Sequence, residues 1–266
     1  MREKLNIPKT IHYCWFGGKP LPDEYKSYID SWKKFCPDFK IKEWNENNFI
    51  PQINSWGGGY NSYFEEAYEA KQWAFVSDYA RLKIVYEEGG IYLDTDVEVL
   101  KSLEPLISNG EGFIGFQNSY EATTGLGFAA APFNPVVKAM LDIYAGRHFL
   151  CNDGKYDRIP CPAANTVALI NCGMKIGKKY CQELQKLEGI TVYPEEYFNP
   201  LNRDTNHLTI TKNTYTIHHY SGTWFDARSK KKALLKKIIP NWFLKKRVEL
   251  IAQKDIKKIV EEIKSN

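Results

Sequence analysis

Alternating apolar and polar positions near the start of the chain predict strand, helix, strand. Residues 10–16 and 39–44 have the apolar richness or alternation of strands. Between them, residues 23–35 predict a helix with Asp23 as its cap and Pro37 as its stop. This order at this spacing is typical of an α/β domain whose sheet is mainly parallel.

Residues 77–100, SDYARLKIVYEEGGIYLDTDVEVL, predict the end of a helix, a break at Gly89-Gly90 and then a strand. Side chains alternate along a strand, which predicts an apolar face of Ile91, Leu93, Val97 and Val99 and a polar face of Tyr92, Asp94, Asp96 and Glu98. Two carboxylates this close repel each other unless a cation lies between them. The stretch therefore predicts a divalent-metal site at a strand end.

The remaining pattern predicts further short elements and a distinct tail. We expect two helices within 61–88, strands at 112–116, 125–129, 190–193 and 215–220, a helix from Pro135 to about 146, and a short helix from Pro162. We expect two units: residues 1–225 as the main domain and residues 226–266 as a basic helical extension, which Pro240 divides into two helices.

The charge is unevenly distributed between these two units. The chain has a net charge of +4, but residues from 226 onward carry 13 Lys and Arg against five Asp and Glu. The body is left with 23 basic and 27 acidic groups. A nucleic-acid-binding protein concentrates basic groups on its main folded face, so the distribution argues against that class of partner.

Cysteine usage and hydropathy indicate a cytoplasmic protein. The six cysteines form no C-x-x-C pair, no signal peptide precedes the first expected strand, and no apolar run approaches the ~20 residues of a membrane span. We therefore expect reduced thiols and a cytoplasmic location, at the inner face of the cell membrane if the tail binds lipid.

Three segments together carry a family resemblance. The phrase S-D-x-x-R followed by G-G-I-Y-x-D-x-D, the opening I-P-K-T-I-H-Y-C-W-F-G-G and the late I-H-H-Y-S-G-T-W span residues 8–224. They resemble the D-x-D sugar-binding region of family 32 glycosyltransferases, which include yeast-type initiating mannosyltransferases and many bacterial capsule enzymes. The phrase is more distantly similar to the glucosyltransferase domains of large clostridial toxins.

The resemblance implies a GT-A fold, a nucleotide-sugar donor and a Mn²⁺ or Mg²⁺ ion that stabilises the departing diphosphate. Asp96 is then the expected direct ligand, with Asp94 binding the ion directly, through water, or touching the donor. Only one of two neighbouring strand residues can point into the site, and by alignment of the motif we choose His219 over His218 as third ligand. A core or surface histidine is the alternative.

The resemblance also implies a donor-binding set. Arg81 is expected to bond to the sugar or phosphate, and Asp78 to accept from sugar hydroxyls or hold Arg81; the alternative is a surface ion pair. Trp15 is expected to stack on the base, or else to pack in the core. The remaining expected donor contacts are Trp73, Ser77, Tyr92, Gly222, Thr223 and Trp224, of which the last three would form a closing loop over the diphosphate.

Asn165 is the expected contact to the transferred sugar or the acceptor, and completes a catalytic set with Asp94, Asp96 and Arg81. The family pattern before it is closer to G-P, whereas this chain has Cys161-Pro162, which weakens this assignment. No carboxylate stands out as a covalent nucleophile. The resemblance implies a retaining reaction with front-face attack by the acceptor hydroxyl.

The expected activity is transfer from a UDP-sugar to a saccharide acceptor, which is lipid-linked, in bacterial capsule or surface polysaccharide synthesis. A GDP-mannose-dependent mannosyltransferase is the alternative. More remote alternatives are a D-x-D phosphatase, which expects Thr or Val where this chain has Glu98, and a non-catalytic sugar- or metal-binding module.

The tail allows two interpretations. Lys and Arg around Trp242-Phe243-Leu244 predict that residues 230–250 bind an anionic membrane surface with shallow aromatic insertion. The alternative is a charge-rich helical extension that packs on the domain.

Overall fold

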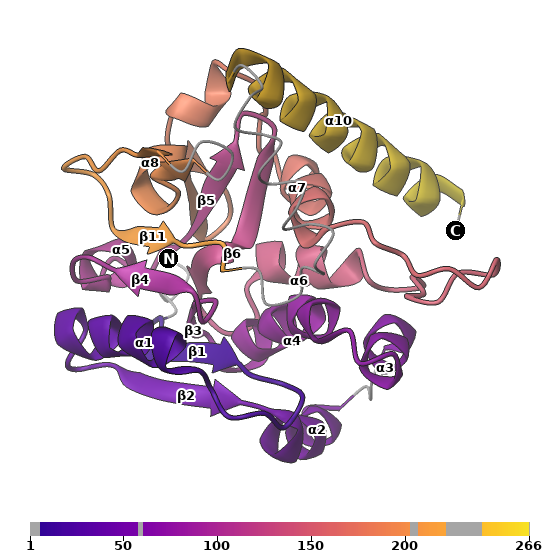
Figure 1. Cartoon of the computed structure of the whole chain (residues 1–266), viewed down its shortest axis with the longest axis horizontal. Helices are drawn as coiled ribbons and strands as arrows, with labels where there is room; N and C mark the ends of the chain where they lie inside the picture. Colours follow the sequence, from indigo (N-terminus) through magenta and orange to yellow (C-terminus); the bar gives the residue numbers. More distant parts are fainter. Residues whose placement is uncertain (1–5, 58–60, 203–206, 222–240, 266) are drawn as a thin grey trace.

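The computed structural model describes residues 6–57, 61–202, 207–221 and 241–265. A seven-stranded mixed sheet runs through the middle of the molecule (Figure 1). The strand order is β2-β1-β3-β6-β5-β8-β7. Five strands share one direction, and β6 and β7 oppose them. The strands are β1 (Thr10–Cys14), β2 (Lys40–Trp44), β3 (Gly90–Tyr92), β5 (Gly112–Asn118), β6 (Glu121–Ala130), β7 (Gln185–Lys186) and β8 (Ile190–Tyr193). The predicted α/β fold with a mainly parallel sheet flanked by helices is confirmed.

Helices cover both faces of this sheet, and two pairs of short strands lie beside it. One face packs against α2 (Glu46–Ser55), α3 (Ser62–Glu69), α4 (Trp73–Glu88), α6 (Pro135–Asp142) and α7 (Cys161–Asn171). The other packs against α1 (Asp23–Phe35), α5 (Glu104–Ile107) and α8 (Glu195–Phe198). The short pairs are β4 (Val97–Val99) with β11 (Thr216–His218) and β9 (Leu201–Asn202) with β10 (His207–Leu208); a 3-10 turn, η1, spans Tyr180–Gln182.

The predicted single strand through the two aspartates is wrong. β3 ends at Tyr92, and the chain then turns, with the Val97 amide donating to the Asp94 carbonyl at 3.0 Å. β4 follows in a separate sheet, antiparallel to β11. The apolar face is nevertheless confirmed, because Ile91, Leu93, Val97 and Val99 are all buried in one core. The turn thus places both aspartates where the two sheets meet.

The Gly89-Gly90 break is confirmed, and backbone crowding explains it. Both residues have positive φ, 67° and 97°, which L side chains rarely adopt. A Cβ on Gly90 would lie 2.7 Å from the Thr10 carbonyl oxygen, and one on Gly89 would lie 2.6 Å from the Pro132 ring. The chain can therefore pass from α4 directly into the centre of the sheet.

Several predicted boundaries differ from those observed. Pro22, not Asp23, precedes α1, and no side chain caps it. The strands at 112–116 and 125–129 extend into the hairpin β5–β6, α6 ends at Asp142, and α7 continues to Asn171. The helix α2 was not predicted; Asn45 caps it by accepting from the Asn47 amide.

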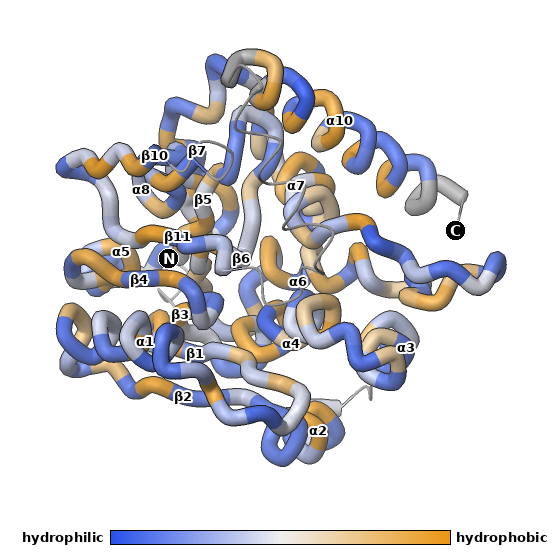
Figure 2. Tube along the Cα trace, viewed as in Figure 1, coloured by the Kyte–Doolittle hydropathy of each residue, from blue (hydrophilic) through white to orange (hydrophobic). Residues whose placement is uncertain are grey.

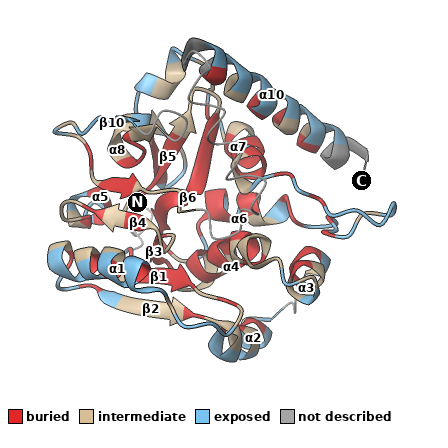
Figure 3. Ribbon diagram, in the orientation of Figure 1, coloured by how far each residue is buried: buried red, intermediate tan, exposed pale blue. Residues whose placement is uncertain are grey.

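The C-terminal helix α10 (Asn241–Ser265) packs along α7, as the second interpretation of the tail expects (Figure 1). Its buried residues lie along one side, as Figure 3 shows: Leu244, Ala252, Ile256 and Ile259. The predicted helix before Pro240 and the predicted domain boundary at 225/226 lie outside the described residues. Among those described, no helix is long and apolar enough to cross a bilayer.

Replacing an inward isoleucine of α10 tests whether this helix belongs to the core. Ile259 is 1% exposed, so we expect Ile259→Ala to lower the free energy of unfolding by about 2–4 kcal/mol through the cavity it leaves. The same change at Ile251, which is 47% exposed, should cost less than about 0.5 kcal/mol. Urea denaturation of the full chain measures both, and equal effects would contradict the packing.

Candidate metal and donor site

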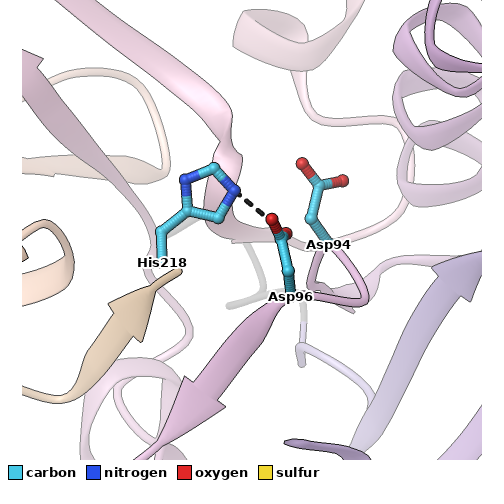
Figure 4. A group of neighbouring side chains, drawn as sticks. All are labelled: Asp94, Asp96 and His218. Atoms are coloured by element: carbon cyan, nitrogen blue, oxygen red, sulfur yellow. Dashed lines mark ion pairs between the residues drawn. The ribbon is translucent and has the colours of Figure 1, made fainter. Parts of the chain in front are cut away.

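Two carboxylates and one imidazole converge at the junction of the two sheets (Figure 4). Asp94 and Asp96 come from the turn between β3 and β4, and His218 from the end of β11. One ligand atom of each lies within 4.8 Å of the others. His218 Nε2 is 3.0 Å from Asp96 Oδ1.

The structure corrects the predicted choice of histidine. His218 faces the two aspartates, whereas His219 Nε2 lies 2.8 Å from Glu98 Oε2 and its ring stacks on Tyr28 at 4.5 Å. Adjacent residues of an extended chain point to opposite sides, so only one of the pair can reach the site. The pairing of β11 with β4 places His218 opposite Val97, the residue after Asp96. This register determines that His218, and not His219, reaches the site.

Burial and charge affect the three groups differently. Burial raises the pKa of Asp94, and Asp96 adds to this effect against the opposing charge of Arg81. Burial also acts to raise the pKa of Asp96, but the charge and hydrogen bond of His218 outweigh it and hold that pKa below its usual value. Burial alone would lower the pKa of His218, yet the two aspartates raise it. The raised pKa of His218 favours the protonated imidazole, whose charge offsets part of the negative charge of the two aspartates.

Arg81 on α4 holds Asp94 from behind. Its Nη2 lies 2.9 Å from Asp78 Oδ1 and 3.3 Å from Asp94 Oδ1, and its Nε donates to the Ser77 carbonyl at 3.0 Å. Tyr92 donates its hydroxyl to Asp94 Oδ1 at 3.0 Å, and its ring lies beneath the guanidinium. Arg81 is only 4% exposed, so this is not a surface ion pair. The geometry favours the prediction that Asp78 holds Arg81 over the prediction that Asp78 accepts from sugar hydroxyls.

The residues present fit a divalent cation on three counts. Two carboxylates and an imidazole form a donor set that suits Mn²⁺. His218 Nδ1 is buried and has no hydrogen-bond partner among the described residues. A Cβ on Gly125 of β6 would lie 3.0 Å from Asp94 Oδ2 and 3.4 Å from Arg81 Nη1, so a larger residue there would shift the carboxylate by a few tenths of an ångström.

Trp15, which is expected to stack on the donor base, follows β1, and the expected donor contacts Trp73 and Ser77 lie on α4. Trp15 is half-buried and donates its indole N–H to the Lys19 carbonyl at 2.6 Å. Trp73, the first residue of α4, packs against Gly17, where a Cβ would lie 2.7 Å from its indole nitrogen. Ser77 donates its hydroxyl to the Trp73 carbonyl at 3.0 Å, a contact within the helix.

Asn165 is buried beside the strand that flanks the aspartates. Its Nδ2 donates to Thr124 Oγ1 at 3.0 Å, and Thr124 precedes Gly125 on β6. Its Oδ1 has no hydrogen-bond partner among the described residues. Cys161, at the start of the same helix, donates a hydrogen bond from its thiol to Asp78. The departure from the G-P pattern therefore places a thiol next to the Asp78–Arg81 ion pair.

The predicted closing loop lies outside the described residues, which stop at Ser221 before Gly222, Thr223 and Trp224. Ser221 itself donates its amide to Asp96 Oδ2 at 2.9 Å. The backbone at Ser221 is therefore in direct contact with the candidate metal site.

Sequence reasoning missed three residues that shape the site. These are His218 and Gly125, described above, and Thr124, which holds Asn165. A signal existed for two of them. The G-L-G in the expected strand 125–129 indicated close backbone approach, and His218 is the other half of the histidine pair.

Comparison with known proteins gives a family match over part of the chain. Residues 22–112, which include α4 and both aspartates, match a family model described as a glycosyltransferase sugar-binding region containing a DXD motif. The predicted resemblance to D-x-D glycosyltransferases is thereby confirmed for this region.

Two curated relatives and one solved structure are similar to part of this chain. An uncharacterized glycosyltransferase, L373, of Acanthamoeba polyphaga mimivirus is 30% identical over 120 residues, 42% of this chain and 44% of its own. Inositol phosphoceramide mannosyltransferase 1 of Schizosaccharomyces pombe is 26% identical over 143 residues, 50% of this chain and 41% of its own. The PaToxG glycosyltransferase structure has a TM-score of 0.47 at 22% identity, covering 62% of this chain and 69% of that one. The chain thus spans less than half the length of either curated relative.

The adjacent histidines provide a matched pair of variants for the metal site. We expect His218→Ala to weaken Mn²⁺ binding at least tenfold, about 1.4 kcal/mol, because it removes a ligand. His219→Ala should change the affinity less than threefold, since that side chain lies against Glu98 and Tyr28. Titration followed by Mn²⁺ electron paramagnetic resonance measures both; the reverse order would restore the choice of His219.

Proposed function

We propose that this chain is a metal-dependent glycosyltransferase that moves a sugar from a nucleotide-sugar donor to a saccharide acceptor. The observation that carries the proposal is that Asp94 and Asp96, which lie in the region that matches the DXD sugar-binding family, converge with His218 from a later part of the chain. A diphosphate leaving group builds up negative charge as it departs, and a cation held by these three residues would stabilise that charge.

Asp94, Asp96 and His218 would hold Mn²⁺ or Mg²⁺, which when bound supplies positive charge to the diphosphate oxygens. Asp96 and His218 are already neighbours, 3.0 Å apart, so two of the three ligands need only separate for a cation to enter between them. His218 must lose its proton to bind a cation, and its buried position between two carboxylates couples that loss to cation entry.

Arg81 and Tyr92 act as positioning residues for Asp94. They approach the same carboxylate from two directions and are 4% and 1% exposed, which leaves little of either for a ligand. Asp78 balances the guanidinium charge from the helix itself. Arg81 therefore supports the site from behind, in place of the direct donor contact expected from the family phrase.

The base of the donor is assigned to the end of β1, beside Trp15 and Trp73. A half-buried indole offers a flat face to a base, and Gly17 leaves room for Trp73 to lie against the loop that follows β1. Asn165, with its carbonyl oxygen lacking a described partner, is assigned to the sugar or the acceptor. Gly222, Thr223 and Trp224 are proposed to close over the diphosphate.

The stereochemistry and the substrates are parts of the proposal. We assign no carboxylate as a covalent nucleophile and propose retention through front-face attack. A UDP-sugar is the favoured donor and a lipid-linked saccharide in bacterial surface polysaccharide synthesis the favoured acceptor, with the enzyme in the cytoplasm. A GDP-mannose donor is the second candidate, because the relative in S. pombe is named a mannosyltransferase.

Removing one carboxylate tests the activity. Thermal-shift screening of the full chain with UDP- and GDP-sugars, with and without Mn²⁺, identifies the donor, and donor hydrolysis then measures turnover. We expect Asp96→Ala to lower metal-stimulated turnover at least 100-fold and to remove the Mn²⁺-dependent shift. Glu98→Ala, which lies further along β4 and is bonded to His219, is the matched control and should retain most activity.

Turnover by Asp96→Ala that still rises with Mn²⁺ would show that the cation binds elsewhere. A Mn²⁺-dependent shift without hydrolysis or transfer of any donor would instead favour a non-catalytic binding module.

A further inference from the structure

The side of α10 that faces away from the domain has a composition unlike that of an ordinary solvent-exposed helix. Three large apolar side chains are exposed there: Phe243 at 49%, Leu250 at 58% and Ile251 at 47%. Phe243 and Leu250 are seven residues apart, a spacing that puts both on one side of a helix. Figure 2 shows the resulting alternation of apolar and polar residues along α10.

Basic side chains lie on both sides of these apolar residues. Two of the acidic residues of α10 are directed elsewhere: Glu249 is half-buried and lies 3.8 Å from Lys178, and Asp255 is half-buried. Glu261 is exposed and lies near Lys257. The helix thus directs most of its positive charge outward and part of its negative charge toward the domain. Its exposed cations, among the described side chains, are Lys246, Arg247, Lys254, Lys257 and Lys258.

We propose that this outward face, defined as Phe243, Lys246, Arg247, Leu250, Ile251, Lys254, Lys257 and Lys258, binds the surface of an anionic lipid bilayer. The helix would lie flat, with Phe243, Leu250 and Ile251 at the level of the acyl boundary and the cations at the headgroups. From residue 243 to 258 the face is about 22 Å long, at 1.5 Å per residue.

This surface differs from the one expected from the sequence. Leu244, grouped there with Trp242 and Phe243, is 3% exposed and packs against the domain, so it cannot enter a membrane. Residues 230–240 lie outside the described part. The proposed membrane-binding surface is therefore the outer side of α10, instead of the predicted segment 230–250.

The chemistry favours lipid over the two other partners of a basic helix. A nucleic-acid backbone would use the cations but would leave Phe243 and Leu250 against phosphate and water. A second copy of the helix would cover the apolar residues but would bring like charges together. An anionic bilayer accepts both kinds of side chain at once.

The packing of α10 would link membrane binding to the proposed activity. The helix packs along α7, and α7 begins at Cys161, which bonds to Asp78 behind the candidate site. Because Ile256 and Ile259 belong to the core that α7 and α4 share, α10 is fixed to the body that carries the site. Binding would hold that body at the bilayer. The inference does not depend on the proposed function, since lipid binding can be measured without a substrate.

Vesicle flotation of the full chain tests the proposal. We expect it to float with phosphatidylcholine vesicles that contain about 30 mol% phosphatidylglycerol, and not with phosphatidylcholine alone, at about 0.1 M salt. Lys254→Gln/Lys257→Gln should weaken binding about 30-fold, as each cation near the surface contributes about 1 kcal/mol. Phe243→Ser/Leu250→Ser should weaken it about tenfold or more.

Matched controls come from other exposed surfaces. Lys26→Gln/Lys33→Gln removes two exposed cations of α1, and Leu208→Ser/Ile210→Ser removes two exposed apolar side chains in and just after β10. Both should bind as the parent chain does, and all four variants should keep its melting temperature within about 3 °C. Equal loss in the controls, equal binding to neutral vesicles, or tighter binding to a DNA duplex than to the anionic vesicles would overturn the proposal.

Discussion

The repulsion between two carboxylates that a tight turn holds side by side is the constraint around which this structure is built. Asp94 and Asp96 lie at the junction of two sheets, where burial raises the free energy of any unbalanced charge. The protein balances them from two directions, with Arg81 behind Asp94 and His218 beside Asp96. The two partners differ in kind, because a guanidinium keeps its proton and an imidazole can lose it. A metal ion can therefore replace the charge on one side while the other side remains fixed.

The fold places each of these partners by an independent structural element. The Gly89-Gly90 break delivers the chain from α4 into the sheet, so that Arg81 and Asp94 come from consecutive elements. Pairing of β11 with β4 brings His218 back from a distant part of the chain. Gly125, on the antiparallel strand β6, leaves the space that the Asp94 carboxylate uses. The site thus depends on local geometry at the break and on long-range strand pairing at β11.

This division explains what sequence reasoning could and could not predict. The first two strands and the helix between them, the glycine break and the apolar side of residues 91–99 follow from local periodicity and were predicted. The turn at Asp94–Val97 was not, because it is decided by where β3 stops pairing with β6 and β4 starts pairing with β11. The choice between His218 and His219 depends on the same register. Likewise, the composition of the tail predicted a basic helix, but only its packing against α7 determines that Leu244 faces inward and Phe243 outward.

The most direct test of the central claim is a crystal soaked with Mn²⁺ and measured at the manganese absorption edge. The account predicts an anomalous peak between the two sheets, within about 2.5 Å of an oxygen of Asp96 and a nitrogen of His218. It also predicts that Arg81 stays on Asp94 while the His218–Asp96 contact opens to admit the ion. A peak elsewhere on the molecule, with His218 still bonded to Asp96, would contradict it.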